Sequence, residues 1–159
     1  MELFTRAYDH PDSAKLIAEL QQVFVVRYGG EDHTPVDPAQ FAPPLGTFIV
    51  GYLDDVPVAC GGWRAHDEAR DSLRPGDAEI KRMYTTDSVR GKGLSRAILA
   101  GLEASALAAG RTRMVLETGE PQPEAIGLYR SSGYARIDNF GFYRENPQSL
   151  CFAKELPRR

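Results

Sequence analysis

The strongest chemical signal in the sequence is a short stretch rich in glycine and basic residues, RGKGLS, at positions 90–95. A strand-like segment precedes this loop and a helical segment follows it. Backbone N–H groups at a helix start have no partner inside the helix, and the helix dipole favours an anion there. Gly91 and Gly93 let the backbone approach an anion without a side chain in the way, and Arg90 and Lys92 add positive charge. The pattern predicts a phosphate-binding loop; the alternative is a glycine-rich turn before a surface helix.

Two common nucleotide motifs do not fit this loop. A P-loop needs a glycine, four residues and then Gly-Lys-Ser/Thr, but Gly91-Lys92 is followed by Gly93 and lacks the upstream glycine. The dinucleotide pattern GxGxxG fails because Arg96 occupies the position of the last glycine. The loop therefore matches neither motif.

A third motif does fit. The pattern Arg90-x-x-Gly93-x-Ser95 resembles the Arg/Gln-x-x-Gly-x-Gly/Ala signature of the GNAT superfamily of N-acetyltransferases, with the small residue Ser95 in the last position. The similarity in element order covers nearly the whole chain and is sharpest from residue 78 to residue 134. This resemblance implies an α/β fold with a mixed, mostly antiparallel central sheet that is flanked by helices on both faces.

The resemblance also implies how acetyl-CoA is bound. In that family the backbone amides of the loop hold the CoA pyrophosphate, and the backbone of the preceding strand pairs with the pantetheine arm like an added strand. Mapped onto this chain, the residues concerned are Met83, Tyr84, Thr85, Arg90, Gly91, Lys92, Gly93, Leu94 and Ser95. The N–H group of Met83 would polarise the thioester carbonyl.

A second segment, PEAIGLYRSSGY, is similar to the C-terminal motif of the same superfamily, in which a helix places a tyrosine beside the CoA sulfur. That tyrosine is Tyr129 here. A phenol with a pKa of about 10 is protonated at neutral pH and can protonate a leaving thiolate whose pKa is about 8.5. The resemblance therefore implies that Tyr129 is the general acid; a core tyrosine packed against Ala125 and Ile126 is the alternative.

Glu79 is the candidate general base. An amine with a pKa of about 10.4 is protonated at neutral pH and must lose a proton before it attacks, and a carboxylate on the strand beside the thioester could take that proton. The segment Glu79-Ile80-Lys81-Arg82 also has the alternation of a half-exposed strand, on which Glu79 would be a surface residue. Both interpretations are open, and Glu117 on the next strand is the reserve base.

Periodicity and turn residues predict the elements that position these groups. Strands are expected at residues 3–8, 47–53, 56–64, 78–85, 113–117, 134–140 and 149–154. Helices are expected from Asp12 or Ser13 to about Tyr28, over residues 96–109, and from Pro123 to the stop at Gly133. Four prolines between residues 31 and 46 predict a loop with at most a short helix near residues 38–41.

Composition and charge argue against several other classes of protein. With 42% hydrophobic and 26% charged residues, the 159 residues are expected to form one globular domain, residues 1–159. The net charge of −3 and the scattered basic residues argue against nucleic acid. No apolar run approaches the roughly 20 residues of a membrane span, so the expected location is the cytoplasm. The three histidines have no metal-ligand spacing, so no metal site is expected, and Cys60 and Cys151 are expected to be core residues.

These observations favour an acetyl-CoA-dependent N-acetyltransferase that acts on a small-molecule or peptide amine by direct attack in a ternary complex, as a monomer or homodimer. A non-catalytic acyl-CoA-binding or regulatory module is the alternative, because it would keep the loop and dispense with the acid and base. The acceptor side would be bordered by Phe24, Tyr28, Trp63, Arg64, Phe140 and Tyr143, although Trp63 fits the core at least as well.

Overall fold

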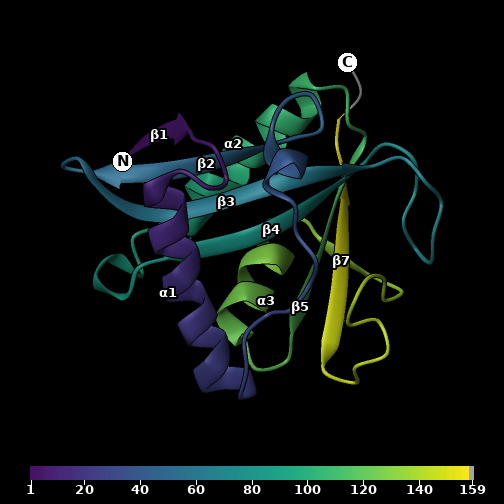
Figure 1. The fold of residues 1–159 in the computed structure, drawn as a ribbon. Coiled ribbons are helices and arrows are strands. Elements are labelled where there is room, and N and C mark those ends of the chain that lie inside the picture. Colours follow the sequence, from purple (N-terminus) through teal and green to yellow (C-terminus); the bar gives the residue numbers. More distant parts are fainter. Residues whose placement is uncertain (158–159) are drawn as a thin grey trace.

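A computed structural model describes residues 1–157, and a seven-stranded sheet forms its centre (Figure 1). The strands are β1 (Glu2–Thr5), β2 (Gly46–Leu53), β3 (Val56–His66), β4 (Asp77–Thr85), β5 (Arg113–Gly119), β6 (Ala135–Ile137) and β7 (Ser149–Glu155). They lie in the order β1-β2-β3-β4-β5-β7-β6. β4 and β5 pair in parallel, and the other neighbouring strands pair antiparallel. The predicted mixed, mostly antiparallel sheet is confirmed.

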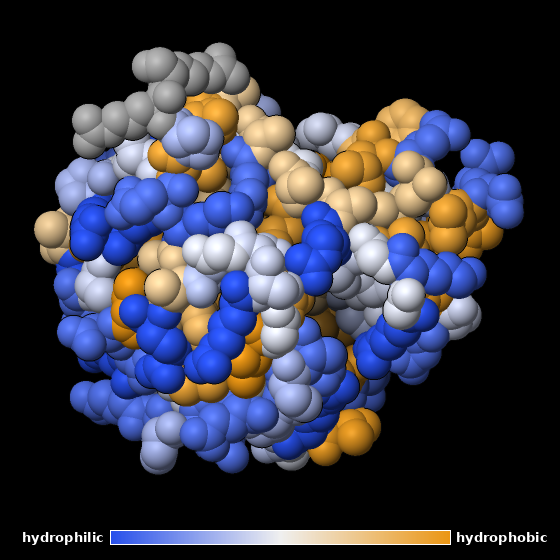
Figure 2. Space-filling view, turned by 180° about the vertical axis from the view of Figure 1, so that it is seen from behind, coloured by the Kyte–Doolittle hydropathy of each residue, from blue (hydrophilic) through white to orange (hydrophobic). Residues whose placement is uncertain are grey.

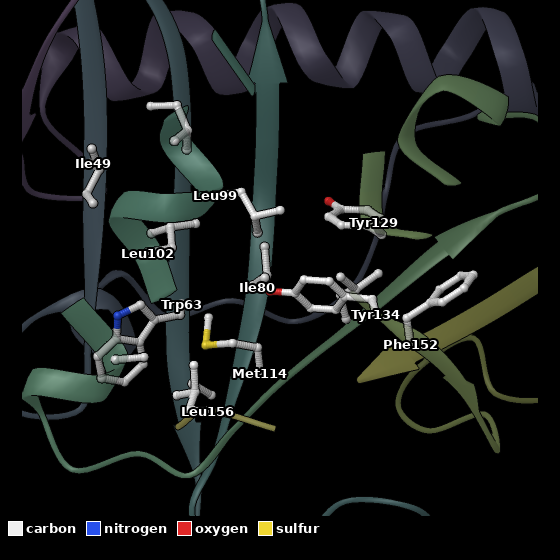
Figure 3. Packing of buried hydrophobic residues seen from close by; sticks show 14 of the residues in the cluster. Ile49, Trp63, Ile80, Leu99, Leu102, Met114, Tyr129, Tyr134, Phe152 and Leu156 are labelled. Atoms are coloured by element: carbon white, nitrogen blue, oxygen red, sulfur yellow. The ribbon is translucent and has the colours of Figure 1, made fainter. Parts of the chain in front are cut away.

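Helices cover both faces of the sheet. Helix α1 (Pro11–Tyr28) lies on one face, where Leu16 and Leu20 pack with residues of β2, β3 and β4. Helices α2 (Leu94–Ala108) and α3 (Pro123–Ser131) lie on the other face. Figure 3 shows part of that second core, where Leu99 and Leu102 of α2 lie near Trp63 and Ile80 of the sheet. The order of strands and helices is the one that the sequence predicts.

Most of the predicted element boundaries hold within a few residues, and the differences have local causes. Helix α1 is capped by His10, whose Nδ1 accepts the Asp12 N–H at 3.0 Å, and Pro11 occupies the first helical turn. The prediction that Asp12 or Ser13 caps this helix is therefore wrong. Two short 3₁₀ helices, η1 (Pro38–Phe41) and η2 (Asp87–Val89), complete the fold, and η1 confirms the short helix expected there.

The last part of the chain forms less strand than its sequence suggests. A strand was expected over residues 134–140, but β6 ends at Ile137. The amide of Asn139 donates hydrogen bonds to the backbone oxygens of Arg144 and Ser149, and the carbonyl of Asp138 accepts one from Ser72. Beyond Ile137 the chain therefore contacts β7 through the Asn139 side chain and not through backbone pairing. Phe140 is consequently buried from a loop and not from a strand.

The two parallel strands of the sheet separate along their length. β4 pairs with β5 only at residues 77–79, which lie opposite residues 113–115. A buried ion pair closes this end, because Arg113 donates two hydrogen bonds of 2.8 Å to the carboxylate of Asp77. Beyond Glu79 the strands part, as Figure 1 shows, and the rest of β4 has no partner on that side. This separation opens a gap in the middle of the sheet.

A bulge in β4 changes the direction of its residues next to the gap. Cys60 of β3 lies opposite Tyr84 and Gly62 lies opposite Lys81, so β4 has one more residue than β3 in this interval. Arg82 takes up the extra length with a φ of +61°. Gly61 leaves room for the Met83 side chain, since a Cβ at Gly61 would lie 2.6 Å from the sulfur of Met83. The bulge therefore sets where the backbone of Met83 and Tyr84 meets the gap.

Hydrophilic residues cover most of one face of the molecule (Figure 2). Figure 2 shows the molecule from behind, where polar residues predominate and hydrophobic residues gather over the end of the sheet that carries β1 and the β2–β3 hairpin. No helix within residues 1–157 combines the length and apolar character that crossing a bilayer requires. Cys60 and Cys151 are both buried, as expected.

Candidate active site

A cavity of about 330 Å³ occupies the gap between β4 and β5. One wall is the unpaired side of β4, and another is the loop that leads into α2. Helices α1 and α3 and the end of β5 line the remaining sides. The cavity is lined by eight of the nine residues predicted to hold the cofactor: Met83, Tyr84, Thr85, Arg90, Gly91, Gly93, Leu94 and Ser95. The exposed residue Lys92 does not line it.

The loop before α2 offers open backbone at a helix start. Gly91 and Gly93 have φ values of +81° and +75°, a left-handed conformation that favours glycine. Gly93 is the N-cap of α2, which therefore begins at Leu94 and not at Arg96, and no side chain caps the helix. A Cβ at either glycine would meet no other atom within 4 Å. The first N–H groups of α2 thus face open space, which fits a phosphate.

Side-chain contacts hold this loop against the end of β4. The hydroxyls of Thr85 and Ser95 are hydrogen-bonded at 2.6 Å, which joins the strand to the first turn of α2. Arg90 donates a hydrogen bond to the backbone oxygen of Thr85 at 3.4 Å and pairs with Asp87 at 3.0 Å. Ser95, at the last position of the sequence motif, therefore has two effects. Its side chain is small, and its hydroxyl fixes the loop to β4.

Tyr129 reaches the same cavity from α3. Its side chain is buried, and its ring lies 5.7 Å from that of Tyr134 in a tilted arrangement. Figure 3 shows its hydroxyl turned toward the strand that carries Ile80. Burial and the neighbouring charge of Glu117 raise the pKa of Tyr129, so the phenol is protonated at neutral pH. Tyr129 lines the cavity, as a general acid would have to, and it also packs in the core, as the alternative interpretation expects.

Glu117 of β5 lies where three cavities meet, since it lines the β4–β5 gap and both neighbouring cavities. Burial raises its pKa, and the charge of Lys81 and a 3.0 Å hydrogen bond from Ser149 offset only part of this effect. The negative charges of Asp32 and Glu79 raise it further. The resulting pKa is about 7, which suits a group that gains and loses a proton near neutral pH.

Glu79 lies in a different environment. It is buried, so the half-exposed strand face considered from the sequence is not what the structure has. Burial acts to raise its pKa, but a hydrogen bond with His66 and the charges of Lys81 and Arg64 lower it to about 2. The Glu79 carboxylate contacts Arg64 at 2.9 Å and His66 at 2.8 Å. It lines a small cavity of about 70 Å³ beside Lys81 and Glu117, and not the β4–β5 gap.

A second cavity of about 310 Å³, here called the acceptor cavity, adjoins the first. The two cavities share Phe24, Asp32, Glu117 and Gln122. Of the residues expected to border the acceptor, Phe24, Tyr28 and Tyr143 line this cavity, whereas Arg64 and Phe140 line the small cavity beside Glu79. Trp63 belongs to the core and donates a hydrogen bond to Ser105 at 3.1 Å.

The sequence analysis missed a buried charge cluster between these cavities. Asp32 pairs with Arg82 at 2.5 Å and with Lys81 at 3.6 Å. Burial acts to raise the pKa of Asp32, but the charge of Lys81 and hydrogen bonds from Thr34 hold it far below its usual range. The only local signal is a pair of adjacent cations in a strand. Their partner, Asp32, comes from a proline-rich loop about 50 residues earlier in the chain.

The arrangement suits acyl transfer from a CoA thioester. The gap offers free strand edge and a phosphate-binding helix start, and a protonated phenol and a carboxyl group with a pKa near 7 reach into it. Within residues 1–157 no group of three or more His, Cys, Asp or Glu side chains is placed to hold a metal ion.

Comparisons with known proteins agree with this chemistry. Residues 14–134 match the model of the acetyltransferase (GNAT) family. The chain is 34% identical over 142 residues to IAA acetyltransferase of Azospirillum brasilense, with 89% of each chain covered. Its structure is similar to that of a candidate acyl-CoA N-acyltransferase from Klebsiella pneumoniae, with 28% identity, a TM-score of 0.81 and coverage of 98% and 97%. A GNAT family acetyltransferase from Elizabethkingia anophelis, solved with acetyl-CoA bound, has the same fold at 14% identity, with a TM-score of 0.68 and coverage of 98% and 97%.

Proposed function

Because this chain belongs to the GNAT family of acetyltransferases, we propose that it transfers an acetyl group from acetyl-CoA to a primary amine by direct attack in a ternary complex. We also propose that residues 1–159 act as one acetyltransferase domain. The observation that carries this proposal is the position of Glu117. It is a partly buried carboxyl group with a pKa of about 7, and it lies where the β4–β5 gap and the acceptor cavity meet.

The residues of the gap suit acetyl-CoA. The open N–H groups at the start of α2, with Gly91 and Gly93 beside them, are suited to hold the pyrophosphate. The free edge of β4 at Met83, Tyr84 and Thr85 is suited to pair with the pantetheine arm as an added strand would. The acetyl-CoA seen in the Elizabethkingia anophelis relative, which shares this fold, is consistent with these roles.

The bound cosubstrate supplies an electrophilic thioester carbonyl. In our proposal the N–H group of Met83 donates a hydrogen bond to the carbonyl oxygen and stabilises the negative charge that develops there. The bulge at Arg82 supports this role because it changes the register of β4 immediately before Met83.

We assign the base to Glu117 rather than to Glu79. A base must be ionised yet able to hold a proton at the working pH, and a carboxyl group with a pKa of about 7 satisfies both conditions. The carboxylate of Glu79, with a pKa of about 2, binds a proton too weakly and is already engaged by Arg64 and His66. Glu117 would take the proton of the amine directly or through a water molecule.

Tyr129 would give a proton to the sulfur of the departing CoA. Its raised pKa keeps the proton on the phenol until a thiolate forms nearby. An acid on α3 and a base on β5 would thus act at the same cavity. A module that only binds acyl-CoA would need neither of these groups.

A CoA-release assay with a panel of primary amines tests this function. The panel includes aliphatic and aromatic amines and amino acids, and IAA, the compound in the name of the Azospirillum brasilense relative, is assayed beside it. We expect acetyl-CoA-dependent CoA release with at least one amine, mass-spectrometric detection of the N-acetylated product, and loss of most of this activity in Glu117→Gln. If no acceptor is acetylated although acetyl-CoA binds, the binding module is the correct function.

A further inference from the structure

The acceptor cavity has aromatic walls held in fixed positions. Tyr28 and Phe24 pack edge to face with their ring centres 5.9 Å apart, and the Tyr28 hydroxyl accepts a 2.8 Å hydrogen bond from Gln122. On the opposite loop, the Tyr143 hydroxyl accepts a 2.8 Å hydrogen bond from the backbone N–H of His33. These contacts join segments about 100 residues apart in the chain. The cavity therefore presents preorganised ring surfaces to a ligand.

The buried positive charges near this cavity are already paired within the protein. Arg82 and Lys81 are paired with Asp32, and Arg64 with Glu79. Among the described residues, no lysine or arginine lines the acceptor cavity itself. Its acidic lining residues besides Asp32 are Glu31, which is exposed, and Glu117, which is bound only by Ser149.

This balance of charge discriminates between acceptors. A carboxylate or phosphate group on the acceptor would leave water for a cavity that offers no lysine or arginine and that has two carboxyl groups besides the paired Asp32, which is unfavourable. An ammonium group would instead lie near Glu117, and aromatic ring faces also attract cations. The imidazole of His33 also lines the cavity and could donate a hydrogen bond to a carboxylate, so it must be part of any test.

From this geometry we propose that the acceptor is a primary amine with an apolar or aromatic body and no acidic group. The inference rests on the proposed acetyl transfer and specifies its substrate class. The amine nitrogen forms a bond to the acetyl carbon as the carbon–sulfur bond breaks. Glu117 takes the amine proton, and the CoA sulfur receives a proton from Tyr129. The aromatic body lies between Tyr28 and Tyr143.

Two acceptors with the same ring separate this proposal from its alternatives. Phenethylamine and L-phenylalanine share an aromatic body and a primary amine, but only the amino acid carries a carboxylate. We expect kcat/KM to be at least about tenfold higher for phenethylamine, because the carboxylate would be desolvated without a partner. Equal or better use of phenylalanine would overturn the proposal and leave acetyl transfer intact. His33→Gln would then show whether the imidazole binds the carboxylate.

A substitution in the wall of the cavity tests the placement. Tyr28→Leu removes an aromatic face, and we expect KM for phenethylamine to rise about five- to tenfold while kcat changes less. Phe4→Leu is the matched control, because Phe4 is an exposed aromatic residue on β1, at the far edge of the sheet, and should change neither value. Equal effects of the two substitutions would mean that the acceptor binds elsewhere.

The ligand preference of the acceptor cavity can be measured even if the enzyme assay fails. Calorimetry with the CoA-bound protein measures the binding of phenethylamine and phenylalanine without any turnover. If no amine of the CoA-release panel is acetylated but phenethylamine binds more tightly than phenylalanine, the proposed function falls and the ligand class of the cavity stands. If neither compound binds, or phenylalanine binds at least as well, the inference is wrong.

Discussion

Two glutamates of the same sheet illustrate how surroundings decide the chemistry of a side chain. Glu79 and Glu117 lie on the two strands that part at the gap, and both are buried from water to a large extent. Burial acts to raise the pKa of each carboxyl group. Arg64, His66 and Lys81 reverse this effect at Glu79, whereas Glu117 has only Lys81 and Ser149 to oppose it. The result is one permanent anion and one group that titrates near neutral pH.

The pKa of Glu117 predicts the pH dependence of catalysis. Below pH 7 the base is protonated, so kcat/KM should fall about tenfold per pH unit, and above pH 7 it should level off. Glu117→Gln should abolish this fall in kcat/KM below pH 7. It should leave a slow rate that increases as the pH approaches the pKa of the amine. Ser149→Ala should make kcat/KM begin to fall at a higher pH, because it removes a hydrogen bond that lowers the pKa of Glu117. A parent profile that is flat from pH 6 to pH 8 would rule out this assignment.

The titration of Glu117 should also change the free energy of unfolding, which is measured without any enzyme activity. Its folded-state pKa of about 7 exceeds the usual 4.5, so its contribution is fully present below about pH 4.5 and is lost as the pH rises through about 7. Relative to the parent, Glu117→Gln should therefore gain stability between pH 5 and pH 8, by on the order of 3 kcal/mol at most. Urea unfolding at the two pH values measures this difference.

Tyr129→Phe removes only a hydroxyl from the proposed acid. Turnover should fall by roughly 10²–10⁴ because the leaving thiolate loses its proton donor, while the affinity for acetyl-CoA should change little. Tyr134→Phe is a matched control in the adjacent ring, since the Tyr134 hydroxyl bonds to Glu103 and does not line the cavity. A Tyr129→Phe enzyme as active as the parent would leave Tyr129 with a packing role alone.

Glu79→Gln should act on stability more than on catalysis. It removes the charge that faces Arg64 and should cost about 1–3 kcal/mol at neutral pH. The cost should shrink on acidification, since the stabilisation by Glu79 is present above about pH 4.5 and is lost as the pH falls through about 2. Glu155→Gln, in an exposed ion pair, should have little effect. If kcat/KM of the Glu79→Gln enzyme no longer fell below pH 7, Glu79 would instead be the base.

At the scale of elements, the site depends on where secondary structure stops. β4 and β5 stay paired for only three residues each, and the buried Asp77–Arg113 pair holds that closed end. Helix α2 begins at a glycine without a side-chain cap, so its first N–H groups are free to bind a ligand. The cavity is therefore formed by a strand that lacks a neighbour and a helix that lacks a cap.

Gly93→Val tests the helix start. The new side chain would occupy the open space beside the loop and should weaken acetyl-CoA binding at least about tenfold by calorimetry. The positive φ of Gly93 adds a cost of about 1–2 kcal/mol or more in stability. Gly110→Val controls for this strain, because Gly110 has a φ of +81°, equally open space, and a position just past the other end of α2. Equal affinities in the two variants would place the phosphate site elsewhere.

At the scale of the whole molecule, the two cavities depend on segments that are distant in the sequence. Helix α1, the loop around Asp32, the end of β5 and the loop around Tyr143 all contribute to the acceptor cavity. A ligand that bridges such segments stabilises the folded chain as a unit, because the unfolded chain cannot bind it.

Acetyl-CoA should therefore raise the melting temperature of the protein. At 100 times its dissociation constant, a ligand adds about 2.7 kcal/mol to the free energy of unfolding. NAD and ATP should have much smaller effects at the same concentration, because the loop before α2 matches neither of their motifs. Equal shifts from all three compounds would contradict selective binding of acetyl-CoA.

Local sequence was sufficient for features that depend on neighbouring residues. The order of strands and helices, the end of α1 at Gly29 and the short helix at residues 38–41 all follow from periodicity and turn residues, and all are confirmed. The glycine-rich loop was located in the same way, because its geometry depends on backbone freedom at Gly91 and Gly93. Such signals extend over a few residues, so one sequence is enough to detect them.

Only the tertiary structure distinguishes the two candidate bases, because it gives their carboxyl groups different pKa values. The low pKa of Glu79 arises from His66 and Arg64 on β3 together with Lys81, whereas the raised pKa of Glu117 arises from burial between strands that separate. The Asp32 cluster and the bond between Tyr143 and His33 likewise join residues 50 to 110 positions apart. Desolvation and charge depend on distances in space, and these distances have no counterpart in the spacing of residues along the chain.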